Sequence, residues 1–557
     1  MTLAALGARV SRAGSGRGWP LFAFIVAALV AVPVLVVLLS VFAPATEVWS
    51  HLVDTVLGRY LENTFWLVVG VGLSTLVTGT VTAWLVTTCR FPGRRIFEIA
   101  LLLPLAVPSY AIAFTYAGLF DFAGPVQSGL RELFGWSRQD YWFPPIHSTF
   151  GAFLVMGLVL YPYVYLLARA AFLEQSVCVL EASRVLGRSA WQSFVQVALP
   201  LARPAIVTGV ALALMEALSD FGAVDFLAVD TFTTGIFRTW FGLGDPQSAA
   251  QLSAMLLAVV FVILALERYS RGQAKYFHTT TRYRPLPGYQ LNGWRRVLAI
   301  LACALPVTFG FLLPGGQLLV WAIRTAPQMV DASFVRLAWN SVALAAVAAA
   351  VAVAIATTLA YAARLRPSRP MTLSTRLASI GYAVPGSVLA VGVLVPFAWV
   401  DNRIDDWARE VLGISTGLIL SGTLFALIFA YVVRFLAVSF NTAEAGLAKV
   451  TPSIDGAART LGAGPRETLR RVHVPMIGGS LITAGLLVFV DVMKELPATL
   501  IMRPFNFNTL AVRAYELAHD ERLADSASAV LAIVLVGIVP VYLLSRAIAG
   551  ARPGSSS

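Results

Sequence analysis

Charged residues are scarce in this sequence, and their scarcity excludes an ordinary water-soluble protein. Only 13% of the 557 residues are charged, whereas 58% are hydrophobic and the mean hydropathy is +0.77. This composition carries far more apolar surface than a soluble core needs, so lipid is the natural solvent for most of the chain. We therefore expect an integral membrane protein.

Residues that form disulfides or hold metals are few and dispersed. The cysteines Cys89, Cys178 and Cys303 lie far apart, so neither a disulfide framework nor a zinc site is predicted, and we interpret them as packing thiols. The histidines share no i,i+4 spacing, so we assign no metal site. They are His51, His147, His278, His473 and His519.

Lysine is rare as well, since the chain has only Lys275, Lys449 and Lys494. None of them follows a glycine, so the phosphate-binding loop G-x-x-x-x-G-K-[ST] is absent from the sequence. The chain is therefore expected to have no nucleotide site or other cofactor of its own, and not to be an enzyme.

Basic residues nevertheless outnumber acidic ones, which gives a formal net charge of +12. In a soluble protein such an excess would suggest a nucleic-acid partner. Here the basic residues cluster in short loops between apolar runs, as the positive-inside rule requires. The excess predicts orientation in a membrane, and no nucleic-acid partner is expected.

Long apolar runs predict transmembrane helices. A bilayer core needs about 20 apolar residues per helix, and twelve stretches of the chain meet this requirement. They cover residues 21–42, 64–88, 98–120, 148–172, 203–223, 250–268, 297–322, 340–363, 377–400, 417–439, 479–501 and 527–547. The expected fold class is an all-α polytopic membrane protein with about 12 spans.

Arginine-rich loops predict the orientation of these spans. The loops at 90–95, 268–296 and 364–376 all fall on the side of the N-terminus when twelve spans are counted. Because positive loops mark the cytoplasmic side, both termini are expected in the cytoplasm. The first apolar run is too long for a typical signal peptide, so we expect an uncleaved first span.

Two polar segments recur at a fixed distance. EASRVLGRSAWQSFVQVALP at 181–200 and GAARTLGAGPRETLRRVHVP at 456–475 share six identities, including Leu186 and Leu461, each displaced by 275 residues. Both segments fall between the fourth and fifth span of their half, on the cytoplasmic side. This placement indicates an internal duplication of a six-span unit.

Further correspondences support the duplication and suggest its boundaries. Asn63 matches Asn340 and Pro108 matches Pro385, in both cases at an offset of 277. The basic link contains prolines and a glycine and has the composition of a seam. The predicted organisation is a first half at 1–267, a linker at 268–296 and a second half at 297–557.

Each polar segment predicts two short helices on the membrane surface, separated by a glycine and closed by a proline. In the first copy, Ala182, Ser183 and Gly187 are small enough to let another surface approach, while Glu181 and Arg184 offer it charge. The alternative is a connector with an amphipathic face at the lipid headgroups. Two copies, one per half, favour a two-fold-symmetric partner.

The segments resemble the cytoplasmic EAA loop of ABC importer permeases, which passes the closure of the ATPase subunits to the spans. The first copy matches it at Glu181, Ala182, Ser183, Gly187, Val197, Leu199 and Pro200, with Arg184 next to them. The second copy matches at Ala457, Ala458, Gly462, Val472, Val474 and Pro475, with Arg459 next to them. Gly456 stands where the family has glutamate, and Asp455 precedes it.

The resemblance implies two pseudo-symmetric six-helix units of a type I ABC importer permease in the bacterial cytoplasmic (inner) membrane. It implies ATP and magnesium on a separate ATPase, with two copies if each EAA loop is engaged. It also implies a periplasmic or lipid-anchored substrate-binding protein. An ion-coupled secondary transporter, which needs no ATPase, is the alternative from a different class.

Two further segments are most similar to ferric-iron uptake permeases. They are SDFGAVDFLAVDTFTTGIFRTWFG at 219–242 and DVMKELPATLIMRPFNFNTLAVRAYEL at 491–517. This similarity implies iron(III) as the substrate. Thiamine, polyamines, sulfate and phosphonates stay open as alternatives, because related permeases carry them.

Four acids inside predicted spans need an explanation, because a charge at a helix centre costs roughly 2.5–3.5 kcal/mol on insertion scales. Glu216 and Asp220 are four residues apart, and Asp491 and Glu495 repeat them, so we expect each pair on one helix face. Together they would form an acidic ring with oxygen ligands suited to iron(III). Lys494 offers the alternative, since it can pair with a neighbouring acid in packing or a gate.

The loops that follow these acids repeat a polar and aromatic pattern. Arg238 and Trp240 correspond to Arg513 and Tyr515. Such residues suit the reception of a substrate-binding protein, which the resemblance implies. An aromatic belt at the membrane interface with an anchoring arginine is the alternative.

Overall fold

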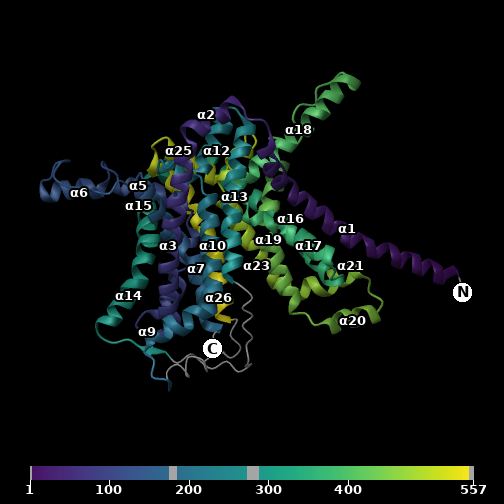
Figure 1. Cartoon of the computed structure of the whole chain (residues 1–557), viewed down its shortest axis with the longest axis horizontal. Helices are drawn as coiled ribbons and strands as arrows, with labels where there is room; N and C mark the ends of the chain where they lie inside the picture. Colours follow the sequence, from purple (N-terminus) through teal and green to yellow (C-terminus); the bar gives the residue numbers. More distant parts are fainter. Residues whose placement is uncertain (1–2, 175–184, 272–287, 551–557) are drawn as a thin grey trace. The chain divides into compact units, whose positions relative to one another are not determined.

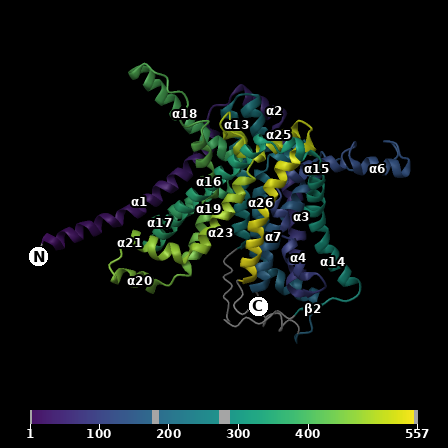
Figure 2. The ribbon, with the colours of Figure 1, turned by 180° about the vertical axis from the view of Figure 1, so that it is seen from behind.

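The protein is almost entirely helical in the computed structural model, which describes residues 3–174, 185–271 and 288–550. Cys178, Lys275 and His278 lie outside these ranges. Within them, the strands β1 (Cys89–Arg90) and β2 (Tyr289–Gln290) pair in parallel over two residues each. The predicted all-α polytopic fold is confirmed, and Figures 1 and 2 show it from opposite sides.

Ten helices in the described part of the chain are long and apolar enough to span a membrane, and two bent helix pairs raise the number to as many as twelve. The ten are Gly18–Phe42, Leu57–Thr88, Thr149–Leu173, Trp191–Ser219, Pro246–Ser270, Trp294–Met329, Ala332–Leu365, Gly386–Leu412, Leu424–Ala448 and Leu523–Leu543. The bent pairs are Arg94–Ala106 with Ser109–Phe134, at 92°, and Pro465–Met476 with Gly478–Met493, at 79°. The predicted span 98–120 contains the first bend. The predicted span 479–501 begins after the second bend and continues through Gly478–Met493 into Pro497–Met502.

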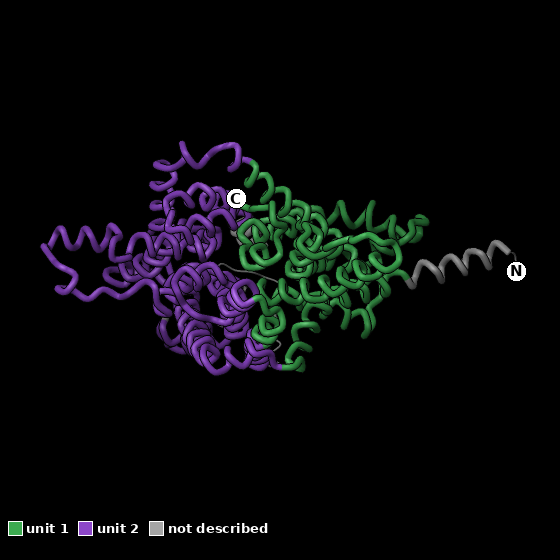
Figure 3. Tube along the Cα trace, turned by 90° about the horizontal axis from the view of Figure 1, so that it is seen from above, with its two compact units in different colours: residues 1–44, 244–254, 336–509 green, residues 45–243, 255–335, 510–557 purple. Residues whose placement is uncertain are grey.

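The chain folds into two compact units, coloured in Figure 3, and each unit takes helices from both sequence halves. Unit 1 contains residues 1–44, 244–254 and 336–509, whereas unit 2 contains residues 45–243, 255–335 and 510–557. The first span therefore belongs to the unit built mainly from the second half. The boundaries 1–267, 268–296 and 297–557 describe the sequence repeat and stay a prediction.

Unit 1 consists of the N-terminal helix and the middle of the second half. Its elements are α1 (Leu3–Leu39), η1 (Ser40–Phe42), most of α16 (Ala332–Leu365), α17 (Arg369–Ala378), η6 (Ile380–Ala383), α18 (Gly386–Leu412), α19 (Leu424–Ala448), α20 (Pro452–Thr460), α21 (Pro465–Thr468), the π-helix η7 (Leu469–His473), α22 (Val474–Met476), α23 (Gly478–Met493) and α24 (Pro497–Met502). Helix α1 packs against α17 and α18.

Unit 2 consists mainly of first-half helices, with the first and last spans of the second half. Its elements are α2 (Glu47–Thr55), α3 (Leu57–Thr88), α4 (Arg94–Ala100), η2 (Leu103–Ala106), α5 (Ser109–Phe120), α6 (Pro125–Phe134), α7 (Thr149–Glu174), α9 (Ala190–Ser193), the π-helix η3 (Phe194–Ala198), α10 (Leu199–Ser219), α11 (Gly222–Phe226), α12 (Phe232–Phe237), η4 (Arg238–Gly242), α14 (Trp294–Val307), η5 (Thr308–Leu312), α15 (Leu313–Met329), α25 (Leu510–His519) and α26 (Leu523–Gly550). Helix α13 (Pro246–Arg271) begins in unit 1 and continues into unit 2.

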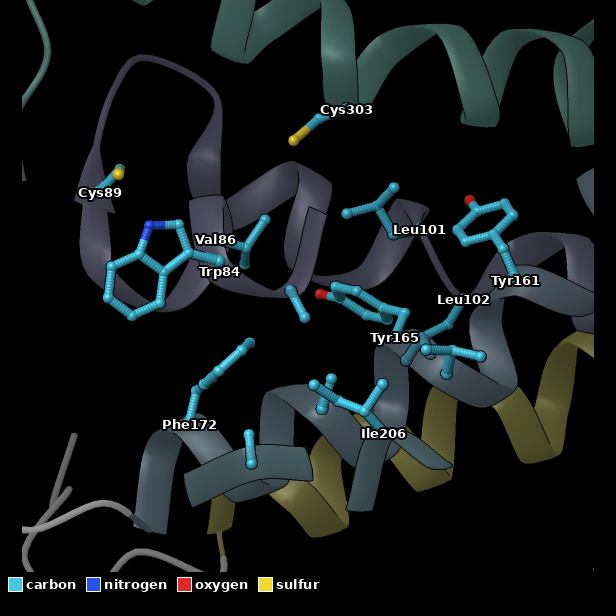
Figure 4. Packing of buried hydrophobic residues seen from close by; sticks show 14 of the residues in the cluster. Trp84, Val86, Cys89, Leu101, Leu102, Tyr161, Tyr165, Phe172, Ile206 and Cys303 are labelled. Atoms are coloured by element: carbon cyan, nitrogen blue, oxygen red, sulfur yellow. The ribbon is translucent and has the colours of Figure 1, made fainter. Parts of the chain in front are cut away.

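An apolar cluster in unit 2 supports the first polar segment (Figure 4). Trp84 of α3 contacts Phe172 of α7 edge to face, with ring centroids 5.5 Å apart, and lies 4.8 Å from the ring of Phe194 in η3. Burying aromatic rings stabilises such a junction through the hydrophobic effect and ring contacts. Cys89 and Cys303 belong to the same cluster as buried free thiols, in agreement with their interpretation as packing residues.

Candidate functional site

The two candidate coupling loops share a glycine turn. Gly187 has φ +75° and Gly462 has φ +85°, so both adopt the left-handed conformation that favours glycine. In the second copy, α20 ends at Thr460 and the left-handed Gly462 follows shortly after it. The two glycines lie 275 residues apart, which is the offset of the sequence repeat.

A π-helix follows each glycine at the same offset. η3 covers Phe194–Ala198 and η7 covers Leu469–His473. Each wide turn ends directly before the Leu-Pro or Val-Pro pair, where Pro200 and Pro475 lack the backbone N–H that a regular α-helix would use. The described parts of the two loops therefore agree with the predicted duplication.

The copies differ after these prolines. Helix α10 runs without a break from Leu199 to Ser219, whereas α22 stops at Met476 and the chain bends by 79° before α23. Gly478 and Gly479 stand at this bend, where the first half has Arg203 and Pro204. Two successive glycines are poor helix formers, which favours the break.

Each loop presents a bare leucine next to its glycine. Leu186 is 75% exposed and Leu461 is 87% exposed, and they are equivalent in the repeat. Because they recur at equivalent positions of the repeat, these exposed apolar side chains are candidates for contact with a partner. Both leucines are identities of the sequence repeat, but they are not among the site residues predicted from the sequence. Their recurrence at the 275-residue offset was the signal that could have found them.

The predicted coupling residues fall into three groups. Glu181, Ala182, Ser183 and Arg184 lie outside the described residues. The exposed residues are Gly187, Pro200, Gly456, Ala457, Arg459, Gly462 and Pro475. Asp455 and Ala458 are buried. In the second half, therefore, the carboxylate nearest to the missing glutamate points into the protein.

Asp455 is clamped by two basic side chains. Arg364 at the end of α16 donates from Nε at 3.1 Å and from Nη2 at 2.7 Å to Oδ2 of Asp455. Nε2 of His473 lies 2.7 Å from Oδ1. Arg364 also donates to the carbonyls of Leu447, in the last turn of α19, and Val450, just beyond that helix, at 2.6 and 2.7 Å. This clamp ties α20 and η7 to two spans of unit 1.

The clamp favours an ionised carboxylate. Burial raises the pKa of Asp455, but the hydrogen bonds from Arg364 and His473 outweigh burial and hold that pKa below its usual value. An ionised Asp455 is therefore paired internally and has little capacity left for an external partner.

The expected arrangement of two acids on one helix face is wrong for both pairs. Helix α10 ends at Ser219, and Asp220 lies in extended backbone beyond it. Helix α23 ends at Met493, and Glu495 lies beyond its end. The reason is that each second acid accepts hydrogen bonds from the short helix that follows, so the regular helix stops before it.

Asp220 and Glu495 accept equivalent hydrogen bonds from the short helix that follows each of them. Oδ1 of Asp220 accepts from the N–H of Ala223 at 2.7 Å, and Oε1 of Glu495 accepts from the N–H of Ala498 at 3.0 Å. A carboxylate at this position satisfies free N–H groups of α11 or α24 and interacts favourably with the helix dipole. Both acids thus hold a helical break in place.

The environments of these two acids differ between the halves. Asp220 receives a hydrogen bond from the hydroxyl of Ser109. Glu495, which is only 5% exposed, pairs with Nη1 of Arg434 at 3.1 Å and accepts from Oγ1 of Thr499 at 2.8 Å. In unit 1, therefore, a glutamate paired with an arginine stands at the position where unit 2 has an aspartate bonded to a serine hydroxyl.

Gly386 makes the second arrangement possible. It stands at the repeat position of Ser109, directly after the corresponding proline. A Cβ atom on Gly386 would lie 2.2 Å from Nη1 of Arg434 and 2.6 Å from Oε1 of Glu495. No side chain can share this space with the ion pair.

The remaining candidate residues of the pathway have side chains of intermediate exposure. Lys494 pairs with Asp491 at 3.0 Å, and both side chains are about one-quarter exposed, at 24% and 22%. Glu216 lies in α10 of unit 2 and is partly buried. Among the described residues, no group of three or more His, Cys, Asp or Glu side chains is placed to hold a metal ion.

The candidate outer residues are mostly engaged within unit 2. Arg238, with a 52% exposed side chain, forms an ion pair with Asp230. The hydroxyl of Tyr515 donates to Asp225 at 2.7 Å, and its ring lies 5.6 Å from that of Phe221. Trp240 and Arg513 are partly buried. Arg238 is therefore the most accessible of the four.

Comparison with known proteins identifies two copies of one family. The model of the family described as "Binding-protein-dependent transport system inner membrane component" matches residues 76–272 and 352–551. Each match contains one candidate coupling loop and one pair of candidate acids.

Several curated relatives are permeases. The Fe(3+)-transport system permease protein FbpB 2 of Haemophilus influenzae is 28% identical over 536 residues, which cover 93% of this chain and 96% of the relative. The ferric transport system permease protein FbpB of Actinobacillus pleuropneumoniae is 22% identical, covering 91% of this chain and 74% of the relative. The sulfate transport system permease protein CysT of Escherichia coli is 33% identical over 34% of this chain and 68% of the relative.

Replacing Gly386 by alanine is expected to destabilise unit 1 by about 1–3 kcal/mol, because the new methyl group overlaps the Arg434–Glu495 pair. Thermal unfolding of the purified chain in detergent measures this loss. Gly485→Ala is the matched control, since a Cβ there meets only Val353 Cγ2 at an ordinary 3.8 Å. Equal melting temperatures for G386A and G485A would contradict the assigned steric role.

Replacing Asp455 by asparagine is expected to cost about 3 kcal/mol at neutral pH, because it leaves Arg364 without its carboxylate. The folded pKa of Asp455 is lowered, so its ionised form stabilises the fold above the unfolded pKa of about 3.9. This stabilisation disappears as the pH falls through the folded pKa. The difference between wild type and D455N should therefore shrink in acid.

Chemical unfolding in detergent between about pH 3 and pH 8 tests this pH dependence. Asp406→Asn is the control, since Asp406 is exposed and its replacement should change stability by less than about 0.5 kcal/mol. A D455N deficit that is constant across the pH range would show that the charge of Asp455 is not the stabilising feature.

Proposed function

The chain belongs to the family of binding-protein-dependent transport system inner membrane components, and from this premise we propose that it is the permease through which an ATP-driven importer carries iron(III). It is a multi-pass protein of the inner membrane. Permeases of this kind work with an ATPase and a substrate-binding protein. The proposal of iron rests on the ferric permeases that align with nearly the whole chain.

The observation that carries the coupling role is the repeated exposed leucine. Leu186 and Leu461 each lie beside a left-handed glycine, before a π-helix and a proline. A surface that occurs once per repeat suits a partner that is itself present in two copies. We therefore assign one ATPase subunit to each loop, with ATP and magnesium bound on those subunits and no catalysis in this chain.

The two contacts with the ATPase are expected to differ in charge. In the first half, Glu181, Ala182, Ser183 and Arg184 would supply the charged and small contact residues. In the second half, α20 offers exposed Gly456, Ala457 and Arg459, while Asp455 stays in its clamp. The second contact thus depends more on Leu461 than on a carboxylate.

The orientation follows from the same assignment. The coupling loops and both termini are placed in the cytoplasm, where the arginine-rich loops are also expected. The sequence halves 1–267 and 297–557 would then be two pseudo-symmetric halves of one permease, joined by the cytoplasmic linker 268–296.

The path for iron is assigned to the two acids that do not hold a helix break. Glu216 and Asp491 are equivalent in the repeat and partly buried, and carboxylate oxygen is a suitable ligand for a hard cation. Asp220 and Glu495 hold helix breaks, so we assign them to the gate rather than to direct contact with iron. Lys494 moderates the charge of Asp491 through their ion pair.

The far side is assigned to reception of the substrate-binding protein. Arg238 is the leading contact because half of its side chain is exposed, at 52%. Trp240, Arg513 and Tyr515 would form the less accessible edge of this surface. A secondary transporter would need neither this surface nor the coupling leucines.

Replacing Leu461 by aspartate is expected to reduce uptake of radioactive iron about tenfold, because a charge replaces the apolar contact with the ATPase and about 1.4 kcal/mol of affinity suffices for such a loss. Recovery of the ATPase in a detergent pull-down should fall in parallel. Leu418→Asp is the matched control, since Leu418 is 62% exposed and lies in the loop between α18 and α19. Undiminished ATPase recovery with L461D would remove the proposed contact.

The double replacement E216Q/D491N is expected to lower iron uptake at least about tenfold while ATPase recovery stays unchanged, because neutral amides bind hard cations more weakly. Uptake of iron, sulfate and thiamine should be measured in the same cells. Unchanged iron uptake would exclude direct contact by these acids. Transport of sulfate or thiamine instead of iron would overturn the substrate assignment and leave the permease role intact.

A further inference from the structure

Unit 2 contains an apolar cavity of about 350 Å³ that the transport mechanism does not use. Its wall includes Tyr116 and Phe120 of α5, the segment 143–146, Phe150 and Leu154 of α7, and Phe309 of η5. The only polar side-chain atom in the wall, the hydroxyl of Tyr116, is satisfied because it donates to the carbonyl of Phe309 at 2.7 Å. The side chains of this wall therefore offer a ligand hydrocarbon contacts alone.

The cavity is continuous with the lipid-facing surface of two spans. Phe150 and Leu154 belong to the span Thr149–Leu173, and Phe309 belongs to the span Trp294–Met329. Their exposed fractions are 51%, 39% and 39%, so all three reach the outer surface of these helices. In a membrane that surface is covered by lipid tails, and the volume lies in the roughly 300–1,000 Å³ range of small-ligand sites.

The neighbouring hairpin, residues 121–148, contains a helix, α6, with the features of a helix at the membrane interface. Figures 1 and 2 show α6 lying across the direction of α3 and α7, which belong to the same unit. Leu133 and Phe134 on α6 are 76% and 55% exposed, and Trp142 in the following loop is 82% exposed. An amphipathic helix that lies across the direction of the spans, with exposed tryptophan near it, is typical of the boundary between headgroups and tails.

A cation completes the chemistry of a phospholipid site. Arg138 is exposed in the same hairpin, with its guanidinium carbon 5.3 Å from the centre of the Phe122 ring. The described structure gives Arg138 no ion pair, so its charge is available to a phosphate. In the sequence, Phe120 of the cavity wall directly precedes the hairpin 121–148, and Phe143 of the wall lies within it.

We propose that residues 121–148 and this cavity bind one phospholipid of the leaflet opposite the coupling loops. One acyl chain fills the cavity, the headgroup phosphate lies near Arg138, and α6 rests in the interface. Helix α7 crosses the membrane between this hairpin and the first coupling loop, which places the two on opposite sides. The site is independent of the identity of the transported solute.

The corresponding hairpin of the second half is built differently. Helix α18 continues from Gly386 to Leu412 as one helix, and the loop after it folds back onto acids. Asp401 accepts from the N–H groups of Leu420 and Ser421 at 2.9 and 2.7 Å. The proposed lipid site is therefore a property of the first half.

Photocrosslinking tests the proposal on the full chain reconstituted in lipid. The probe is phosphatidylglycerol with a diazirine on one acyl chain, and crosslinked peptides are mapped by mass spectrometry. We expect labelling concentrated in residues 143–158. Leu154→Trp fills the cavity and should reduce this labelling about tenfold, whereas Leu73→Trp, at a lipid-facing position of α3 with 58% exposure, should leave it unchanged.

Arg138→Glu separates the headgroup contact from the cavity. It should reduce labelling by the phospholipid about threefold or more, and labelling by a diazirine diacylglycerol without phosphate should not change. Absence of labelling in residues 143–158, or labelling that L154W leaves intact, would overturn the site. A photoreactive residue at Trp142 that captures a substrate-binding protein rather than lipid would assign the hairpin to protein docking instead.

Discussion

A buried carboxylate must be paired with a cation or with N–H donors, and this constraint determines which segments of unit 1 contact one another. Arg364 holds Asp455, and Arg434 holds Glu495. In both places the acid and its arginine come from different segments of the chain, so satisfying the charge also fixes how those segments meet. Breaking such a pair leaves an uncompensated charge in a poorly polarisable surrounding, which costs more than the pair itself contributes. Each pair is therefore a strict geometric restraint.

The two restraints share helix α19. The Asp455 clamp joins α20 to α16 and to the end of α19, while Arg434 lies in α19 and connects it to the break before α24. A movement of α20 would therefore act on a span that also contacts Glu495. Unit 2 uses the hydroxyl of Ser109 in place of an arginine, so the corresponding joint there is held by a weaker, uncharged donor.

Much of this arrangement was predictable from the sequence, because membrane insertion and gene duplication both leave linear signals. Hydropathy located the spans, and the 275-residue offset located both candidate coupling loops with their glycines and prolines. The ends of helices were harder to predict. Asp220 interrupts α10 because of partners at Ser109 and Ala223, and the distance to Ser109 along the chain hides one of these contacts from any local pattern.

The inward turn of Asp455 was unpredictable for the same reason, since its partner Arg364 lies 91 residues away in sequence. The bend before α5 did have a local signal in Pro108, which the sequence analysis used only as evidence of the repeat. The assembly of units from both halves had no local signal, because helix packing depends on which faces meet after insertion.

That assembly has a consequence for biosynthesis. Helix α1 emerges first, but the helices against which it packs, α17 and α18, are made about 300 residues later. At the usual roughly 5–20 residues per second, α1 waits on the order of 15–60 s without its neighbours. Until α17 and α18 are synthesised, α1 must contact either the insertion machinery or the surrounding lipid.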